Sequence, residues 1–134
     1  MKKQITVIGL LFIATTALLS CKKDTVSLKA RIMGKWTVNK IEVSGNTNPS
    51  LNGTFNYTIN DYLDFKSDND DQVELSLNNQ RTIGTYTTSL GDDFVMSFPE
   101  GVSNATVKSL TQSQFQFTAK IDKTNIVKVY YLTR

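Results

Sequence analysis

The sequence predicts an all-β domain, an antiparallel sandwich or barrel. Between residues 21 and 134 there are 14 Thr, 9 Val and 6 Ile against 3 Ala, and β-branched side chains favour pleated strands over helices. Short segments in this range alternate between apolar and polar residues, which is typical of strands with one buried face. Turn-forming clusters separate these segments at nearly even spacing, as a meander of antiparallel strands requires.

Residues 1–20 have the order of an export signal. Lys2 and Lys3 precede a largely apolar run over residues 5–19, and the small residue Ser20 follows that run. The run is 15 residues long, whereas a membrane-spanning helix needs roughly 20. We therefore expect a signal peptide that is removed rather than a permanent membrane span.

The segment LLSC, residues 18–21, resembles the lipobox of bacterial lipoproteins. The resemblance implies that Cys21 receives a diacylglyceryl thioether, becomes the first mature residue and anchors the protein to the membrane, with residues 21–27 as a lipidated tether. It also implies the outer membrane, because Lys22 stands where an Asp often marks inner-membrane retention; periplasmic and surface-facing orientations both stay open. Cys21 is the only cysteine, so no intramolecular disulfide is available.

The charge balance gives no indication of a nucleic-acid partner. The whole chain carries 15 basic and 12 acidic residues, a net charge of +3, but Lys2 and Lys3 leave with the signal and the mature balance is +1. Lys22 and Lys23 follow the expected lipid attachment point. We expect them to form a solvated tether, with contact to anionic headgroups as the alternative.

The elements follow in order along the mature chain. Ser27 is a candidate N-cap for one or two helical turns, with Leu28 and Ile32 on one side. We then expect eight strands, near residues 35–44, 54–66, 72–77, 81–88, 93–98, 104–110, 114–121 and 125–133. Turn signals lie at residues 67–71, 78–79, 90–93, 99–101, 111–113 and 122–125.

Two of these strands are expected to be irregular. In the first strand, Trp36 and Val38 share one face while Ile41 and Val43 share the other, which predicts a bulge near Asn39. The strand over residues 54–66 is expected to be interrupted or kinked at residues 59–61.

The alternation also predicts which aromatic side chains point inward. The clearest segment is QFQFTAKI at residues 114–121, which places Phe115 and Phe117 on the apolar face. The full set of expected inward aromatic residues is Phe55, Tyr57, Phe65, Phe94, Phe98, Phe115 and Phe117. An eight-stranded barrel encloses room either for side chains or for one small ligand, so these residues either line an apolar pocket or fill the interior.

An ordered set of short motifs resembles the small lipocalin-like lipoproteins of Gram-negative bacteria, within the wider calycin group. The motifs are GKW at residues 34–36, FKSD at 65–68, GTY at 84–86 and VYYLTR at 129–134. The resemblance implies an eight-stranded antiparallel up-and-down barrel over residues 28–134, preceded by the short helical turn.

The resemblance also implies how one end of the barrel is closed. Trp36, in the Gly34-x-Trp36 motif, would close that end, and Arg134 would pack across the indole as a cation–π contact. The alternative is that Trp36 is simply a core aromatic residue of another β fold.

Few catalytic groups are available. The sequence has no histidine and its only cysteine is expected to be lipidated, which excludes Ser/His/Asp and Cys/His nucleophile systems. A carboxylate pair for glycoside hydrolysis is still conceivable, but its geometry is not readable from sequence. The DNDD cluster at residues 68–71 lacks the spacing of an EF-hand loop and is expected to be a hydrated hairpin tip. We therefore predict no catalytic residue, no cofactor and no metal site.

These expectations combine into two candidate functions for a protein that is not an enzyme. The first is a lipid-anchored envelope lipoprotein whose barrel binds a small apolar ligand at its mouth, beneath the loop at residues 44–53. The second is a filled barrel that presents residues 44–53 or 89–93 to another protein, as an interaction or inhibitor module. The sequence names neither the ligand nor a protein partner.

Overall fold

The computed structural model describes residues 26–67 and 71–134. The expected signal peptide, Cys21 and most of the DNDD cluster lie outside the described residues. The described helical elements are α2 (Leu28–Ile32) and the 3-10 turn η1 (Pro49–Leu51). The described strands are β1 (Gly34–Ser44), β2 (Gly53–Asn56), β3 (Tyr62–Phe65), β4 (Gln72–Leu77), β5 (Gln80–Thr88), β6 (Asp93–Phe98), β7 (Gly101–Leu110), β8 (Gln114–Ile121) and β9 (Val127–Thr133).

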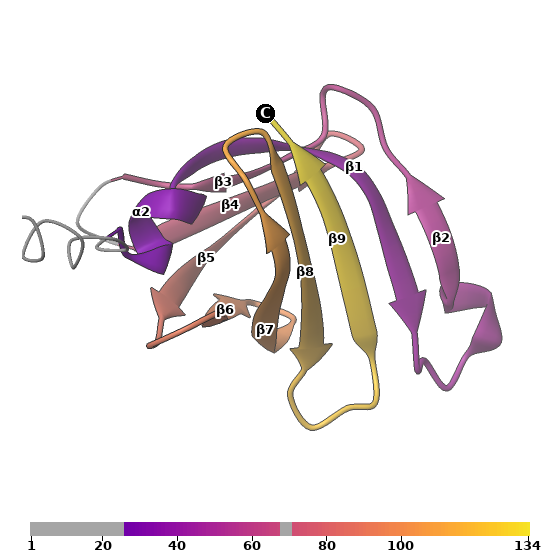
Figure 1. The fold of residues 1–134 in the computed structure, drawn as a ribbon. Helices are drawn as coiled ribbons and strands as arrows, with labels where there is room; N and C mark the ends of the chain where they lie inside the picture. Colours follow the sequence, from indigo (N-terminus) through magenta and orange to yellow (C-terminus); the bar gives the residue numbers. More distant parts are fainter. Residues whose placement is uncertain (1–25, 68–70) are drawn as a thin grey trace, which may run out of the picture.

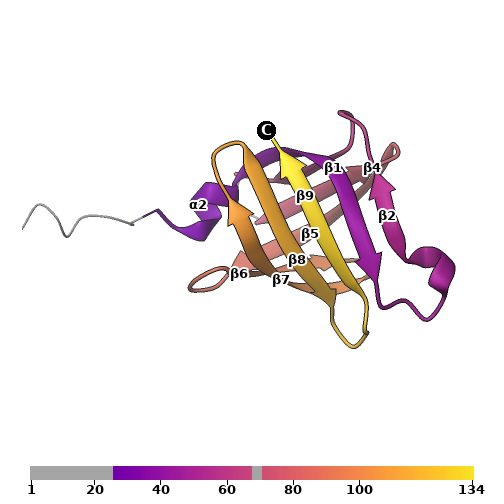
Figure 2. The same ribbon diagram turned by 45° about the vertical axis from the view of Figure 1, so that its right-hand side comes forward.

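Eight of these strands close into an antiparallel barrel. The sheet order is β2-β1-β3-β4-β5-β6-β7-β8-β9, and β9 pairs back with β1. The strand β2 is not part of the closed ring and pairs only with β1. In Figure 1, β3 to β5 cross behind β7 to β9 at a steep angle, and β2 lies on the side away from α2; Figure 2 shows the same separation. The all-β barrel and the preceding helical turn are as predicted.

The first strand has different neighbours along its length. Its residues 34–37 pair with β3 and its residues 40–43 pair with β2, while β9 runs along its other edge. The pairing with β9 shifts register between Val38 and Lys40, so the predicted bulge at Asn39 is confirmed. The bulge moves Trp36, Val38 and Ile41 to the same interior, where all of them are buried.

The expected strand over residues 54–66 is two strands, β2 and β3, and the chain between them includes residues 59–61, where an interruption or kink was predicted. The chain turns between β2 and β3, and Asp61 holds this turn. One carboxylate oxygen of Asp61 accepts a hydrogen bond from the Thr58 backbone N–H at 2.7 Å, and the other accepts one from the Asn78 N–H at 2.8 Å. The Thr58 hydrogen bond is the largest cause of the lowered pKa of Asp61. The break frees β2 to diverge from the barrel.

The helix α2 plugs one end of the barrel. The Ser27 side chain caps it by accepting a hydrogen bond from the Ala30 N–H at 3.2 Å. Leu28 and Ile32 are buried against the barrel core, as the sequence predicted. None of the helices within the described residues has the length and apolar character needed to cross a bilayer.

The hydrophobic core runs from Leu28 to Leu132 and forms a single cluster. Every buried side-chain nitrogen or oxygen of the described residues has a hydrogen-bond partner. Because the closed sheet and this core fall within residues 26–134, a chain that begins at residue 26 contains everything that a compact domain needs to fold on its own.

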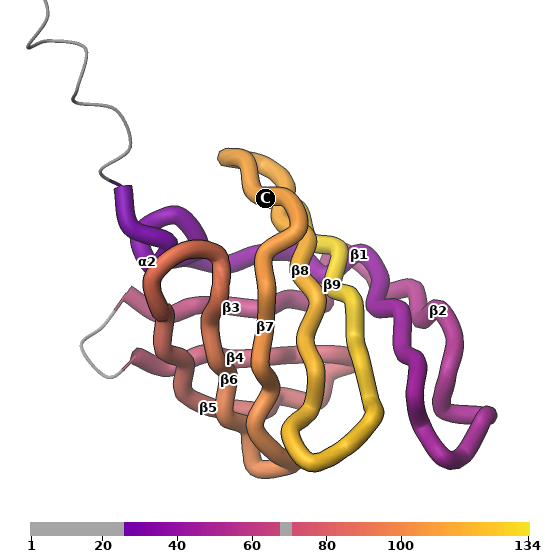
Figure 3. Tube along the Cα trace, turned by 60° about the horizontal axis from the view of Figure 1, so that its bottom comes forward, coloured from indigo at the N-terminus to yellow at the C-terminus, as the bar shows by residue number. Residues whose placement is uncertain are grey.

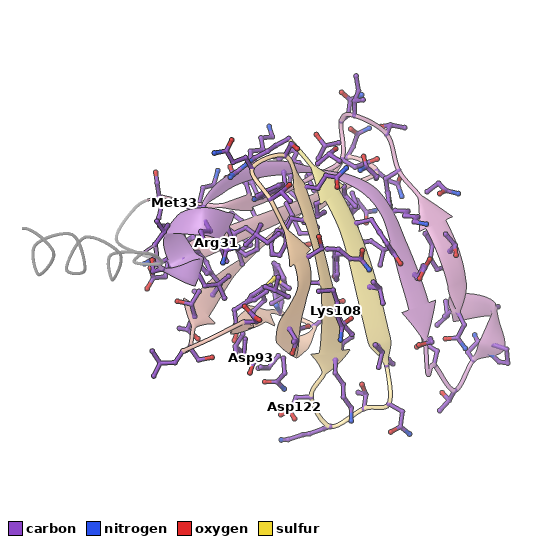
Figure 4. All side chains as sticks on the ribbon, in the orientation of Figure 1. Arg31, Met33, Asp93, Lys108 and Asp122 are labelled. Atoms are coloured by element: carbon purple, nitrogen blue, oxygen red, sulfur yellow. The ribbon has the colours of Figure 1, made fainter. Side chains whose placement is uncertain are left out.

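The connections define two ends of the barrel. The first, called the closed end, carries α2 and the β5–β6 and β7–β8 connections; the second, called the mouth, carries the β1–β2, β4–β5, β6–β7 and β8–β9 connections. Asn78 and Asn79 make the β4–β5 turn with φ of 52° and 65°, as a two-residue type I′ hairpin requires. Figure 4 shows Arg31 and Met33 at the closed end and Asp122 at the mouth, on the β8–β9 hairpin.

Candidate functional site

The closed end is sealed by three residues that the sequence singled out. The Arg134 guanidinium carbon lies 3.8 Å from the centre of the Trp36 ring, which is fully buried. Gly34 has φ of +109°, and a Cβ there would lie 3.4 Å from Arg134 Nη1. Glycine therefore supplies both the backbone conformation and the space that this stack needs.

Hydrogen bonds fix the two stacked side chains. Trp36 Nε1 donates to the Ile32 carbonyl at 2.8 Å. Arg134 donates from Nη1 to the Met33 carbonyl at 2.8 Å and from Nη2 to the Arg31 carbonyl at 3.3 Å. A guanidinium that satisfies carbonyl groups at a helix C-terminus stabilises that helix end. This end of the barrel is a structural plug. The hollows at this end, of about 740 and 260 Å³, lie on the surface between α2 and the β5–β6 and β7–β8 connections.

The interior next to the plug is filled by aromatic rings. Phe65, Phe94, Phe115 and Phe117, which were expected either to line a pocket or to fill the interior, pack on one another. Phe115 and Phe117 have ring centres 4.9 Å apart, and Phe94 and Phe117 have centres 5.0 Å apart. Contacts of this kind are typical of a close-packed core. The open question of a filled or hollow barrel is therefore answered for this half: it is filled.

The mouth is hollowed. One hollow, here called the β4–β6 hollow, has a volume of about 350 Å³ and is lined by Leu75, Leu77, Gln80, Thr82, Phe98, Pro99, Glu100 and Lys128. The other, called the β1–β2 hollow, has a volume of about 340 Å³ and is lined by Val43, Asn46, Leu51, Phe55, Tyr57, Glu100, Ile121, Ile126 and Lys128. Both lie within the size range of small-molecule sites. In Figure 3, β2 lies beside β1 at the right-hand edge, on the side away from β5 and β6.

The two hollows share Lys128 and Glu100, which form an ion pair across the mouth. Lys128 Nζ lies 3.9 Å from Glu100 Oε1. Lys128 comes from β9, where it pairs in register with Val43 of β1 and Ala119 of β8. It therefore shares the inner face of the barrel with those apolar residues. Glu100 comes from the β6–β7 connection on the other side of the opening.

Tyr130 lies one inward step below Lys128 on the same face of β9. Its ring stacks on Phe117, with ring centres 4.6 Å apart and an interplanar angle of 13°. Burial is the main cause that raises the pKa of Tyr130, and the charges of Glu100 and Tyr57 raise it further. The phenol therefore stays protonated near neutral pH and keeps a donor hydroxyl. Tyr130 and Phe117 form the floor between the mouth and the filled half.

The remaining expected pocket residues, Phe55, Tyr57 and Phe98, lie at the mouth. Phe98 is buried and lines the β4–β6 hollow. Phe55 pairs in register with Ile41 and so lies on the inner face of the sheet, but its side chain is 40% exposed. Phe55 lines the β1–β2 hollow and stays partly exposed because β2 diverges from the barrel.

The sequence did not single out Lys128 or Glu100. A signal for Lys128 was present, since it shares parity with the inward residues Tyr130 and Leu132 in the last strand. Glu100 lies in a turn, where alternation gives no direction.

A separate charged cluster lies on the outer face of the barrel. The buried Glu74 carboxylate accepts hydrogen bonds from Arg81 Nε and from the Tyr62 hydroxyl, each at 2.6 Å, and Lys66 Nζ lies 3.2 Å from it. The Arg81 hydrogen bond is the largest cause that lowers the pKa of Glu74 to about 2. Every member is paired, as in a structural cluster. Within residues 26–67 and 71–134, no group of three His, Cys, Asp or Glu residues is arranged to hold a metal ion.

The fold and the mouth define a barrel of the small-ligand-binding type. A family model described as a lipocalin-like domain matches residues 32–117. The chain belongs to the lipocalin-like domain family. Comparisons with curated proteins and with solved structures give no match.

Proposed function

We propose that this lipocalin-like domain binds a small, largely apolar molecule at the mouth of its barrel. The observation that carries the proposal is the contrast between the two halves of the barrel. The interior of the closed half is packed with aromatic rings, and the hollows at that end lie on the surface between α2 and the neighbouring connections. The mouth holds two hollows of about 350 and 340 Å³ lined by residues such as Leu75, Phe55 and Ile121. Concave, mostly apolar surfaces with a few polar groups are the usual form of a ligand site.

The test is displacement of a neutral, fluorescent naphthylamine probe from the chain that begins at residue 26. The wild-type domain should bind the probe and release it to competing apolar molecules. Thr82 lies on the inner face of β5 and lines the β4–β6 hollow, so Thr82→Trp should fill that hollow and weaken binding. Thr87, exposed on the other face of the same strand, provides the matched control Thr87→Trp. Equal binding by both variants, or no binding by the wild type, would contradict the proposal.

The proposed role is binding without catalysis. The whole sequence contains no histidine, and histidine is the most frequent general base near neutral pH. The carboxylate at the mouth, Glu100, faces a lysine rather than a second carboxylate, and glycoside hydrolysis needs a carboxylate pair. Incubation with a panel of ester and glycoside substrates should give no turnover above buffer.

We also propose that Cys21 carries a lipid that holds the domain in the cell envelope, most simply at the outer membrane. The support is the order of the export signal, the LLSC segment and the single cysteine. The chain between Cys21 and Val26 spans at most about 18 Å when extended, which would keep the barrel close to the membrane surface. Cys21→Ala should abolish incorporation of radiolabelled fatty acid and release the protein from the membrane fraction. Retention of the label would overturn the anchor.

A second candidate function is a protein-interaction module. The observation that favours it is the exposure of apolar side chains in the two loops named by the sequence: Leu90 is 99% exposed and Leu51 is 54% exposed. Crosslinking in intact cells should then enrich one partner, and Leu90→Ser or Leu51→Ser should remove it. Recovery of the same bulk envelope proteins with and without these substitutions would count against this candidate.

A further inference from the structure

We infer that the ligand is an amphiphile with an anionic head group, and that the head group pairs with Lys128 at the mouth in place of Glu100. This inference rests on the proposed function, because it names the chemistry of the molecule that the mouth binds. It assigns Lys128 as the residue that selects charge and Glu100 as an internal competitor for it.

Lys128 lies on the inner face of β9, at the mouth. Its register partners Val43 and Ala119 are apolar and share the inner face, so the lysine stem lies against apolar surface while the ammonium reaches into the opening. The Lys128 side chain is 25% exposed. Lysine is seldom buried unless it is paired, and an ammonium on the inner face of a hollow is a natural partner for an anion that enters it.

Glu100 is a weak ion-pair partner for Lys128. Glu100 Oε1 lies 3.9 Å from Lys128 Nζ, and the Glu100 side chain is 61% exposed. By contrast, Glu74 on the outer face has three partners within 3.2 Å. An exposed ion pair at the limit of contact distance contributes little to stability. Glu100 can therefore turn toward water at small cost and leave Lys128 to a ligand.

The surroundings of the ammonium also favour an anion. Tyr57 lines the β1–β2 hollow beside Lys128, and its hydroxyl is a hydrogen-bond donor. A carboxylate or phosphate can accept hydrogen bonds from this phenol and from lysine, whereas a cationic head group would meet the ammonium at close range.

The two hollows then explain where the apolar tail goes. Because Lys128 borders both of them, a head group on Lys128 lets the tail lie against Leu75, Leu77 and Phe98 on one side, or against Val43 and Phe55 on the other. The filled half below Tyr130 blocks deeper entry. The head group is therefore bound near the rim, and the tail lies along the mouth instead of pointing down the barrel axis.

The experiment compares three amphiphiles of equal tail length in the probe-displacement assay: dodecanoate, dodecanol and dodecyltrimethylammonium, each below its micelle concentration. The wild-type domain should prefer dodecanoate to dodecanol by about ten-fold, as expected for one charge-assisted contact. Lys128→Met should abolish this preference, and Lys128→Arg should retain it. Glu100→Gln should tighten dodecanoate binding several-fold. Lys120→Met, at an exposed lysine on the outer face of β8, is the matched control and should behave as wild type.

The outcomes separate this inference from the proposed function. If dodecanol and dodecanoate bind equally well, or if Lys128→Met retains the preference, the inference is overturned and binding at the mouth stands. If none of the three amphiphiles displaces the probe, both fail. A loss of dodecanol binding in Lys128→Met would point to a damaged fold, and Lys128→Arg then decides the matter, because only the charge-selective role predicts that arginine keeps the preference.

Discussion

Arg134 and Trp36 form the seal at the closed end, with the guanidinium carbon 3.8 Å from the centre of the indole ring. The same guanidinium donates to the Met33 carbonyl, directly after α2, and through Nε to the Gln112 carbonyl at 2.9 Å. One side chain therefore connects β9, the helix end and the β7–β8 connection. Gly34 of the family motif lies next to this contact, and its φ of +109° is a backbone conformation that favours glycine.

Removing this seal should destabilise the whole barrel. Arg134→Ala removes a cation–π contact and several hydrogen bonds to backbone carbonyls, and we expect the free energy of unfolding to fall by about 1 to 3 kcal/mol. The free energy of unfolding of Arg134→Lys should lie between those of wild type and Arg134→Ala, because lysine keeps the charge and loses the planar fork. Urea unfolding followed by Trp36 fluorescence measures both. Lys108→Ala, at an exposed position, is the control, and an equal loss there would contradict the assigned role.

The packed half and the mouth should respond differently to loss of an aromatic ring. Phe117→Ala should lower the free energy of unfolding by about 3 to 5 kcal/mol, because it opens a cavity among three neighbouring rings. Phe55→Ala should change stability by less than about 1 kcal/mol but weaken ligand binding. Thermal unfolding and probe displacement measure the two effects. A strongly destabilised Phe55→Ala would mean that β2 belongs to the core.

Glu74 should make the stability of the barrel depend on acidity. Its pKa is lowered from 4.5 to about 2 in the folded protein. Ionised Glu74 therefore contributes fully to the free energy of unfolding above about pH 4.5, and this contribution is lost as the pH falls toward 2. Because Arg81 and Lys66 reach solvent, we expect a contribution of about 1 to 3 kcal/mol. Glu74→Gln should be less stable than wild type at pH 7, and this difference should shrink at pH 2.5.

The control for this pH dependence is Glu42→Gln. The Glu42 carboxylate lies 3.6 Å from Lys40 on the exposed surface, where ion pairs contribute little. The free energy of unfolding of Glu42→Gln should differ little from that of wild type at both pH values. A Glu74→Gln difference that stays constant between pH 7 and pH 2.5 would show that the cluster does not hold Glu74 ionised.

Two glycines with similar backbone conformations should tolerate alanine differently. Gly45 has φ of +82°, and a Cβ there would lie 1.8 Å from the Asn125 carbonyl oxygen. Gly91 has φ of +89°, with nothing within 4 Å of a Cβ. Gly91→Ala should lower the free energy of unfolding by about 1 kcal/mol, because of the backbone conformation alone. Gly45→Ala should cost at least twice as much and should also weaken ligand binding, since the displaced β1–β2 and β8–β9 connections border the mouth. Equal costs in thermal unfolding would contradict the close approach at Gly45.

Much of the fold was predictable because strand pairing in a meander is local. Alternation identified Phe115 and Phe117 as inward residues, and the change of parity after Val38 located the bulge at Asn39. The break between β2 and β3 was expected as an interruption or kink at residues 59–61. Its full effect depends on Asp61, whose carboxylate bonds the N–H of Asn78 on a different hairpin, and no local pattern records that contact.

The sequence by itself determined that the chain is a β-meander and which faces of its strands are apolar, because both depend on neighbouring residues. Only the tertiary structure decided which aromatic residues pack on one another and which surround a hollow. It also decided that Lys128 meets Glu100 across the mouth. Both outcomes depend on distances across a closed barrel, between strands far apart in the chain, and these distances follow from the barrel's closure and from the divergence of β2.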